Sequence, residues 1–151
     1  MSPKLQRSQL DAWRSMLRGQ ALLIEQVERE LAAAGLPPLG WYDVLTELDK
    51  AGGRLRIHEL ADAVILSRSG LSRLLDRLET AGLLRREPCE DDRRGAYAAI
   101  TQEGRDMLDR MWPVYERCLL EHFAPQLDRA AARVLRSTLD GVTESVRRAP
   151  S

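Results

Sequence analysis

The chain has 151 residues, of which 44% are hydrophobic and 30% are charged. This length and balance predict one globular domain over 1–151 with a core of its own, and they exclude a disordered chain. Basic and acidic residues each number 23, so the formal net charge is zero. Proteins that bind nucleic acid usually carry a net positive charge, so the total charge by itself argues against DNA. Where the charges lie along the chain decides whether that argument holds.

Apolar residues at helical or alternating spacing, separated by glycine and proline, predict the secondary structure in chain order. We expect helix 8–34, helix 39–51, strand 54–57, helix 58–64, helix 68–81, strand 83–88, strand 96–100, helix 101–122 and helix 126–147. Ser67 has the side chain of a good N-cap for helix 68–81, and Gly82 suits the left-handed residue that follows a helix. Thr101 is the expected cap of the helix after the strands.

Two of these helices, 58–64 and 68–81, are short and joined by a tight turn, and a β-hairpin follows them directly. This order is that of a winged helix-turn-helix, in which the second helix enters the major groove of DNA. The hairpin, or wing, reaches the neighbouring minor groove or backbone. We therefore predict a mainly α protein with a small β-hairpin wing, of the α+β class, and place the winged helix-turn-helix lobe at 39–100.

The N-terminal end of helix 68–81 combines small hydroxyl side chains, a glycine and guanidinium groups, whereas Asp76 and Glu79 lie further along. Guanidinium groups bind phosphate and guanine in a planar, bidentate way, and a helix N-terminus itself favours phosphate. This polarity predicts that the basic end faces DNA. The predicted DNA contacts are Ser67, Arg68, Ser69, Gly70, Ser72, Arg73 and Arg77. The alternative is that the arginines only solvate one face of the helix.

A second basic group lies at the tip of the predicted hairpin, where Asp92, Arg93 and Arg94 follow one another. An aspartate two residues before an arginine can pair with it across the turn, and an arginine at the tip can enter a narrow minor groove. We therefore predict DNA contacts at Arg93, Arg94 and, on the incoming strand, Arg86, with Asp92 stabilising the wing. The alternative is a solvated run in which residues 90–92 offset the arginines.

Several segments of the chain form a pattern when their order and spacing are taken together. They are Trp41–Leu48, Glu59–Ala61, Ser67–Leu83, Asp92–Thr101 and Glu103–Arg105. In this arrangement the chain resembles the MarR family of bacterial transcription regulators, and the flanking helices match that family in length and order. Two positions depart from the family pattern: His58 stands where Ser or Thr is usual, and Gly70 replaces a bulkier residue.

The resemblance implies a homodimer in which helices 8–34 and 101–148 interlock with those of a second copy. Such a dimer would read a pseudo-palindromic operator with half-sites about one helical turn, ~34 Å, apart. The terminal helices carry apolar residues on more than one face, for example residues 22–24 beside the stripe of Trp13. This surplus agrees with an interface between chains, and packing within one chain is the alternative.

The resemblance also implies a small aromatic or phenolic effector, bound between the dimer helices and the DNA-binding lobe. The candidate lining residues are Trp13, Leu17, Trp41, Tyr42, Asp43 and His58. Most of them suit a protein core equally well, so both interpretations stay open. Some relatives sense oxidants through a cysteine near the N-terminus, but no cysteine precedes residue 89 in this chain.

The sequence contains no phosphate-binding glycine loop, nucleophile–base signature or metal-ligand motif, so we expect neither an enzyme nor a cofactor. Cys118 and His122 are spaced for one helix face but lack a third ligand nearby, so we expect no metal. Cys89 and Cys118 are the two cysteines and cannot form a disulfide framework, which indicates a reduced, cytoplasmic protein. No uncharged apolar run approaches the ~20 residues of a membrane span, so we expect no membrane partner.

These observations predict a ligand-responsive transcriptional regulator, a repressor that binds double-stranded DNA as a homodimer. The zero net charge is compatible with this function because the arginines in question gather at one helix end and one hairpin tip. The alternative is a winged-helix module that binds another protein and has lost DNA binding. A third possibility, a small-molecule carrier or enzyme, would bind its ligand without any effect on DNA.

Overall fold

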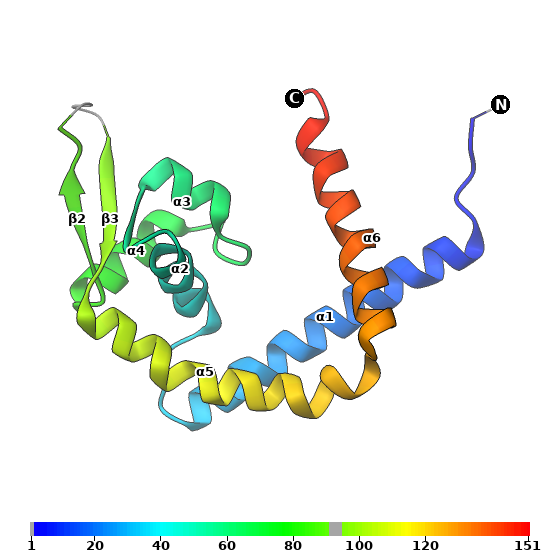
Figure 1. Cartoon of the computed structure of the whole chain (residues 1–151), viewed down its shortest axis with the longest axis horizontal. Helices are drawn as coiled ribbons and strands as arrows, with labels where there is room; N and C mark the ends of the chain where they lie inside the picture. Colours follow the sequence, from blue (N-terminus) through cyan, green and yellow to red (C-terminus); the bar gives the residue numbers. More distant parts are fainter. Residues whose placement is uncertain (1, 91–94) are drawn as a thin grey trace. The chain divides into compact units, whose positions relative to one another are not determined.

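The structure is a computed structural model of the chain, and it describes residues 2–90 and 95–151. Its elements, in chain order, are α1 (Arg7–Ala33), α2 (Leu39–Lys50), β1 (Arg54–Arg56), α3 (Ile57–Ala63), α4 (Leu71–Thr80), β2 (Leu84–Pro88), β3 (Ala96–Ile100), α5 (Gln102–His122), the 3₁₀ helix η1 (Ala124–Gln126) and α6 (Arg129–Arg148) (Figure 1). The chain divides into two compact units, Met1–Glu116 and Arg117–Ser151, whose boundary lies inside α5. The mainly helical fold with a small antiparallel sheet confirms the predicted fold class.

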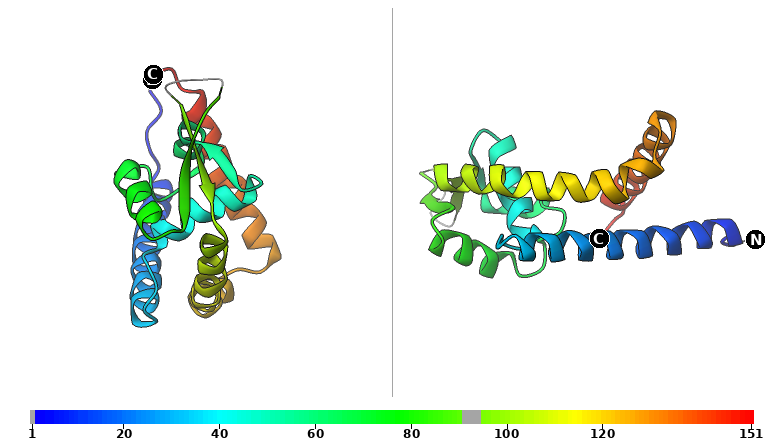
Figure 2. Two further views of the ribbon diagram at one scale, coloured as in Figure 1. Left: turned by 90° about the vertical axis from the view of Figure 1, so that its left-hand side faces the viewer. Right: turned by 90° about the horizontal axis from the view of Figure 1, so that it is seen from below.

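Helix α1 is a single helix of 27 residues, visible as one long rod in Figure 2. Its fully buried side chains, Val27 and Leu31, lie near its C-terminal end. There Glu28 Oε1 also accepts the backbone N–H of Leu39 at 2.8 Å, which fixes the start of α2. Large apolar side chains further towards the N-terminus are exposed, and they are Leu10, Trp13, Leu17 and Leu22. Helix α1 is therefore anchored to the lobe at one end and presents an apolar surface along the rest.

The strands form one antiparallel sheet in the order β1-β3-β2. The predicted hairpin of β2 and β3 is confirmed, and β1 pairs with the other edge of β3. Tyr97 of β3 lies between Arg56 of β1 and Glu87 of β2, while Ala98 lies opposite Arg86. Because successive strand side chains point to opposite faces, Arg86 shares the inner face with Ala98, a member of the hydrophobic core.

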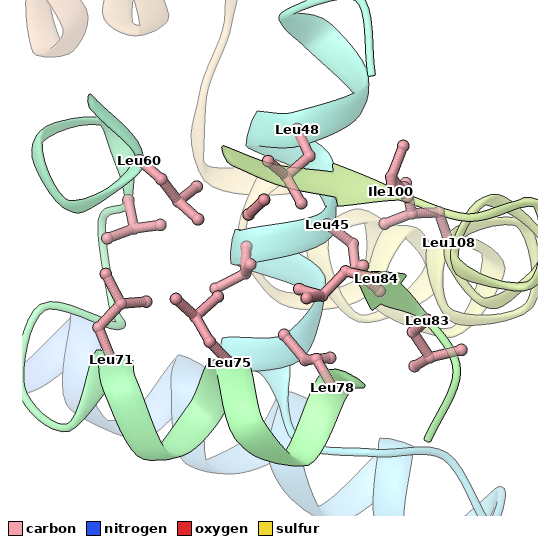
Figure 3. Packing of buried hydrophobic residues seen from close by; sticks show 13 residues of the cluster. Leu45, Leu48, Leu60, Leu71, Leu75, Leu78, Leu83, Leu84, Ile100 and Leu108 are labelled. Carbon is pink, nitrogen blue, oxygen red and sulfur yellow. The ribbon is translucent and has the colours of Figure 1, made fainter. Parts of the chain in front are cut away.

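A leucine-rich core holds the lobe together. Figure 3 shows leucines of α2, α3 and α4 converging with residues of the sheet and the start of α5. Leu71, Leu75 and Leu78 recur at spacings of four and three, so they form a single apolar stripe along α4. The buried members of the core are Val44, Leu45, Leu48, Leu60, Val64, Leu71, Leu75, Leu78, Leu83, Leu84, Ala98, Ile100 and Leu108. This core fixes which sides of α4 remain for other contacts.

Helix α4 begins at Leu71 rather than at Arg68. Its N-cap is Gly70, whose φ of 74° lies in the left-handed region that suits glycine. The prediction of Ser67 as the N-cap is therefore wrong, because the Ser67 hydroxyl bonds to the Gly40 carbonyl of α2 instead. Consequently Arg68 belongs to the turn between α3 and α4 and not to the helix.

The C-terminal end of α4 is joined to the start of α5 by hydrogen bonds. Gly82 has a φ of 77°, and its N–H bonds to the Glu79 carbonyl at 3.0 Å, as in a left-handed helix cap. The Thr101 hydroxyl donates to the Gly82 carbonyl at 2.6 Å and accepts the N–H of Gly104 at 3.1 Å. The predictions for Gly82 and Thr101 are confirmed. A displacement of the first turn of α5 would therefore be transmitted to the end of α4.

Helix α6 also begins later than predicted, at Arg129 rather than at residue 126. Asp128 Oδ1 accepts the N–H of Ala131 at 2.7 Å and caps the helix, whereas Pro125 lies in η1. Exposed apolar side chains of α6 are Val134, Val142 and Val146. Within residues 2–90 and 95–151, no helix is both long enough and apolar enough to span a bilayer.

Candidate nucleic-acid interface

Asp43 fixes the turn that connects α3 to α4. Its carboxylate lies in α2, where the residue is 8% exposed, and it accepts the backbone N–H groups of Ile65 and Leu66 at 3.0 and 2.6 Å. Hydrogen bonds to a carboxylate are stronger than neutral ones, so the turn is held firmly against α2. The protein's own donors thus occupy the Asp43 oxygens, which gives this residue a role in positioning the helix-turn-helix; its expected place beside an effector stays a prediction.

Ser67 is turned inward beside Asp43. Its side-chain oxygen lies 3.1 Å from the Gly40 carbonyl and 3.3 Å from Asp43 Oδ2, and the residue is 4% exposed. The predicted DNA contact of Ser67 is therefore corrected, because its hydroxyl is used inside the lobe. The residues that follow it, Arg68 and Ser69, are exposed. The turn thus keeps one polar side chain inside and presents the next two to solvent.

Helix α4 carries a basic face beside its apolar stripe. Arg73 and Arg77 lie four residues apart, so they share one side of the helix, and both are exposed. Within the described part of the chain, neither pairs with a carboxylate. Ser72, the neighbour of Arg73, is exposed as well. The predicted DNA contacts on α4 itself are therefore accessible to a ligand.

A third face of α4 holds Arg86 of β2. Arg86 Nη1 lies 2.7 Å from Asp76 Oδ1 and 3.1 Å from Glu79 Oε1. The hydrogen bond to Asp76 is the largest of the influences that raise the pKa of Arg86, while desolvation lowers it, so the guanidinium stays charged. Two carboxylates of the lobe thus already balance the charge of Arg86, and its DNA contact stays a prediction.

A groove of about 750 Å³ lies between the starts of α3 and α4 and the tip-side end of β3. Its lining residues are Arg56, Ile57, His58, Ala61, Arg68, Gly70, Leu71, Ser72, Arg73, Gly95 and Ala96. The structure thereby places His58, which was expected to contact an effector, beside the predicted DNA contacts Arg68 and Arg73. Of the basic residues in this lining, Arg56 lies 3.9 Å from the Glu59 carboxylate, whereas Arg68 and Arg73 have no such partner among residues 2–90 and 95–151 and suit an anion. We refer to this hollow as the basic groove.

Arg56 is a residue of the basic groove for which the sequence predicts no role. It ends β1 and directly precedes α3. A side-chain hydrogen bond with Tyr97 is the largest of the influences that raise its pKa, and its guanidinium carbon lies 5.7 Å from the centre of the Tyr97 ring. The signal that could have identified it is the alternation of Arg54, Leu55 and Arg56, which places both arginines on one face of the strand.

The predicted contacts at the hairpin tip, Asp92, Arg93 and Arg94, lie outside the described residues. Their expected roles, stabilisation of the wing by Asp92 and minor-groove contact by the two arginines, stay predictions. The strands that lead to them end at Pro88 and begin again at Ala96. Ala96 lines the basic groove, so the end of β3 nearest the tip belongs to the same surface as the start of α4.

The residues expected to line an effector site are distributed over different places. His58 lines the basic groove, whereas Trp41 lines a separate groove of about 460 Å³ together with Met107 and other residues of α5. Trp13 and Leu17 are 52% and 45% exposed on α1. Each of these two grooves thus contains one of the six candidates, and neither groove brings the candidates together.

Tyr42 belongs to a cluster of three aromatic rings that the sequence reasoning missed. Its ring centre lies 6.2 Å from that of Trp112 and 5.3 Å from that of Tyr115, and the latter two are 5.6 Å apart. The cluster joins α2 to α5 within the first unit. The spacing of three residues between Trp112 and Tyr115 places them on one side of a helix, and it was the signal that could have identified them.

Metal-binding groups do not assemble in the part of the chain that the structure describes. No three His, Cys, Asp or Glu side chains there lie close enough to hold an ion. Cys89 is buried just after β2, and its backbone N–H bonds to the Gly95 carbonyl at 3.3 Å. This residue is therefore packed at the end of the hairpin nearest its tip.

Comparison with known proteins points to one family. A family model described as the MarR family matches residues 34–95. AbsC of Streptomyces coelicolor, a MarR family transcriptional regulator, is 33% identical, and the match covers 97% of this chain and 99% of that protein with a TM-score of 0.84. Sco3205 of the same organism, a MarR family regulator solved in complex with DNA, is 30% identical over 100% of this chain and 94% of that protein, with a TM-score of 0.87.

A curated relative gives a shorter match. The HTH-type transcriptional regulator PecS of Dickeya dadantii is 34% identical over an alignment of 90 residues, and the match covers 56% of this chain and 54% of that protein. The chain spans about half the length of the curated relatives it matches. The relatives named here are transcriptional regulators and not enzymes, in agreement with the expectation from the sequence.

Proposed function

Because the chain belongs to the MarR family of transcriptional regulators, we propose that it is a cytoplasmic DNA-binding repressor that acts as a homodimer on a pseudo-palindromic operator. The observation that carries the proposal is the basic groove. Arg68 and Arg73 line it and are exposed, and neither has a carboxylate partner among residues 2–90 and 95–151. Unpaired guanidinium groups on a concave surface suit phosphate and guanine.

In the proposed complex, α4 enters the major groove with its N-terminal end foremost. Arg73 and Ser72 read base edges, while Arg68 contacts a phosphate from the turn. Arg77 adds a phosphate contact one helical turn further along. Gly70 permits close approach, since nothing lies within 4 Å of the place where its Cβ would stand. Ser69, exposed in the same turn, supplies a hydroxyl to the backbone.

The start of α3 forms the second part of the proposed interface. His58 is exposed and lines the same groove as Arg73. Arg56 lines it too, but it is paired with Glu59 at 3.9 Å, so we assign no phosphate contact to it. The first helix of a helix-turn-helix crosses the DNA backbone, so we assign His58 to a phosphate contact. The predicted wing contacts Arg93 and Arg94 complete the interface.

The proposed dimer is formed by the terminal helices, 8–34 and 101–148. Support comes from the exposed apolar side chains of α1 and α6, for example Trp13 at 52% and Val146 at 68%, because monomers rarely expose large contiguous apolar surfaces. Sedimentation equilibrium should therefore give twice the mass of the 17.1 kDa chain. A monomer at micromolar concentration would contradict this part of the proposal.

We further propose that a small aromatic or phenolic effector relieves repression. The aromatic cluster of Tyr42, Trp112 and Tyr115 offers rings for such a ligand between α2 and α5. The hydrogen bond from Thr101 to Gly82 ties α5 to the end of α4, so a ligand that displaces α5 would also displace α4. Regulation would then be a shift of population between two spacings of the recognition helices.

Selection of duplexes from a randomised library tests the proposed function. The purified chain is incubated with the library at fixed salt, and bound duplexes are recovered, amplified and sequenced. We expect a pseudo-palindrome with half-sites about 10 base pairs apart, bound at least ~1000-fold more tightly than an unrelated duplex. A folded, dimeric protein that enriches no sequence would overturn the proposal and favour the alternative of a protein-interaction module.

A further inference from the structure

Arg86 joins the wing strand β2 to the recognition helix α4 through both its backbone and its side chain. Glu79 Oε2 accepts the Arg86 N–H at 2.8 Å, and Glu79 Oε1 lies 3.1 Å from Nη1. Asp76 Oδ1 lies 2.7 Å from the same Nη1, and the Ser72 carbonyl lies 3.5 Å from Nη2. Positions separated by four and then three residues lie on one face of a helix, so Arg86 is held along two turns of α4.

The position of Arg86 in β2 allows this contact to set the direction of the strand beyond the core. Leu84, two residues earlier on the same face of β2, is 1% exposed and belongs to the core. Arg86 is the next residue on that face, nearer to the hairpin tip. The core thus fixes the foot of the strand, and the pairs with Asp76 and Glu79 fix its continuation.

The charges around Arg86 argue against a contact with DNA. Two carboxylates face one guanidinium, so the local charge is negative, and a phosphate brought to Arg86 would be repelled by Asp76 and Glu79. Its side chain is 31% exposed, against 64% for Arg85 on the opposite face of the strand. Arg86 therefore differs from Arg68 and Arg73, which carry no such partners in the described chain.

We propose that Arg86 is a positioning residue for DNA recognition, which sets the angle between β2 and α4 without touching DNA. The proposal rests on the function proposed above. Helix α4 and the wing must meet neighbouring parts of the duplex at the same time. A hairpin released from Asp76 and Glu79 would meet its part of the duplex less often, while the contacts of α4 would persist.

A direct phosphate contact is the competing role, and Asp76→Asn separates the two. If Arg86 positions the wing, loss of the Asp76 charge loosens the wing and weakens DNA binding, although a negative charge has been removed. If Arg86 contacts phosphate, the same substitution releases its charge and strengthens binding.

The experiment titrates a duplex selected by the wild-type chain, using fluorescence anisotropy over a series of salt concentrations. We expect Arg86→Gln and Asp76→Asn each to weaken binding about tenfold, with an unchanged slope of log affinity against log salt. The double variant should bind no more weakly than Arg86→Gln alone, because Arg86→Gln already removes the contact with Asp76. A slope for Arg86→Gln that is shallower by about 0.9 per protomer, or tighter binding by Asp76→Asn, would overturn the proposal.

Two matched controls accompany the variants. Arg85→Gln makes the same change one residue earlier, on the opposite face of β2, and should alter affinity by no more than about twofold. Asp62→Asn removes an exposed carboxylate of α3 and should not weaken binding. If Arg85→Gln weakens binding as much as Arg86→Gln, the effect belongs to charge in general and the proposal fails.

Footprinting supplies a readout that a loss of fold would not produce. With Arg86→Gln, hydroxyl-radical protection next to the half-site should decrease, while protection of guanine N7 in the major groove persists. Loss of both protections would contradict a positioning role.

If Arg86→Gln fails to fold, Asp76→Asn decides by the sign of its effect on DNA affinity. If the wild type selects no duplex, the proposed function fails and this inference with it; if it selects one that Arg86→Gln binds equally well, this inference alone fails.

Discussion

Two polar faces of α4 carry charges that the protein uses differently. On one face, Asp76 and Glu79 pair with Arg86 at 2.7 and 3.1 Å. On the other, Arg73 and Arg77 are exposed and meet no carboxylate in residues 2–90 and 95–151. The contrast shows that an arginine is available to DNA according to its neighbours in the fold, which the number of arginines does not reveal.

The turn before α4 shows the same contrast over two adjacent residues. Ser67 is 4% exposed and bonds to α2, whereas Arg68 is exposed. Buried polar groups that bond within the protein, such as Ser67, stabilise the lobe. Exposed polar groups such as Arg68 remain available to a ligand. The contrast predicts that removal of a paired group lowers the stability of the fold, and that removal of an unpaired group lowers DNA binding alone.

The largest expected effect is a loss of stability when a paired group, the Asp43 carboxylate, is removed. Asp43→Ala leaves the N–H groups of Ile65 and Leu66 without their acceptor, and we expect it to lower the free energy of unfolding by about 3 kcal/mol. Urea denaturation followed by circular dichroism measures this change. The control is Asp49→Ala on the same helix, whose carboxylate pairs with Arg105 at the surface at 3.2 Å and should cost less than about 1 kcal/mol. If Asp43→Ala and wild type unfold at the same urea concentration, paired polar groups do not stabilise the fold as this comparison requires.

Arg73→Ala tests the effect of removing an unpaired arginine on DNA binding. We expect about thirtyfold weaker binding of the selected duplex and a relaxed preference at one base of each half-site, because a bidentate base contact is lost. Unfolding should stay within about 0.5 kcal/mol of wild type. Anisotropy titrations and a repeated library selection measure these effects, with Arg110→Ala in α5 as a control for loss of an exposed arginine. A wild-type affinity for Arg73→Ala would remove this residue from the proposed interface.

The next prediction concerns the backbone conformation of Gly70, the N-cap of α4. Gly70→Ala places a side chain at a φ of 74°, which costs about 1 kcal/mol in stability, with nothing within 4 Å to cause a clash. Gly19→Ala, in the middle of α1 with equally open surroundings, should instead stabilise by up to about 1 kcal/mol. Thermal unfolding of both variants measures the difference. Equal effects of the two substitutions would show that the left-handed conformation does not matter for α4.

The smallest expected effect is that of Arg77→Gln. Arg77 lies one helical turn beyond Arg73, further from the N-terminal end that enters the groove, so we expect about threefold weaker binding with no change in base preference. The salt slope should decrease slightly. A loss as large as that of Arg73→Ala would shift the proposed centre of recognition along α4.

The sequence predicted those features that depend on residues close together in the chain. The cap formed by Gly82, the capping hydroxyl of Thr101 and the hairpin of β2 and β3 all follow from local patterns, and each is found. The leucine stripe of α4 is of the same kind, because its period alone identifies it.

The features that the sequence did not predict depend on contacts between distant residues. Ser67 has the side chain of a good helix cap, but its hydroxyl bonds instead to acceptors in α2 that are more than 20 residues away in the sequence. Arg86 looks like any basic strand residue until the register of β2 brings it to Asp76 and Glu79. The zero net charge hides the same distinction, because it counts paired and unpaired arginines alike.

The most direct test of this account compares the salt dependence of DNA binding for three proteins: wild type, Arg68→Gln and Arg86→Gln. If unpaired arginines meet the phosphates and paired ones do not, Arg68→Gln should make the slope of log affinity against log salt shallower by about 0.9 per protomer. Arg86→Gln should weaken binding at the wild-type slope. The reverse result, a wild-type slope for Arg68→Gln and a shallower one for Arg86→Gln, would contradict the account.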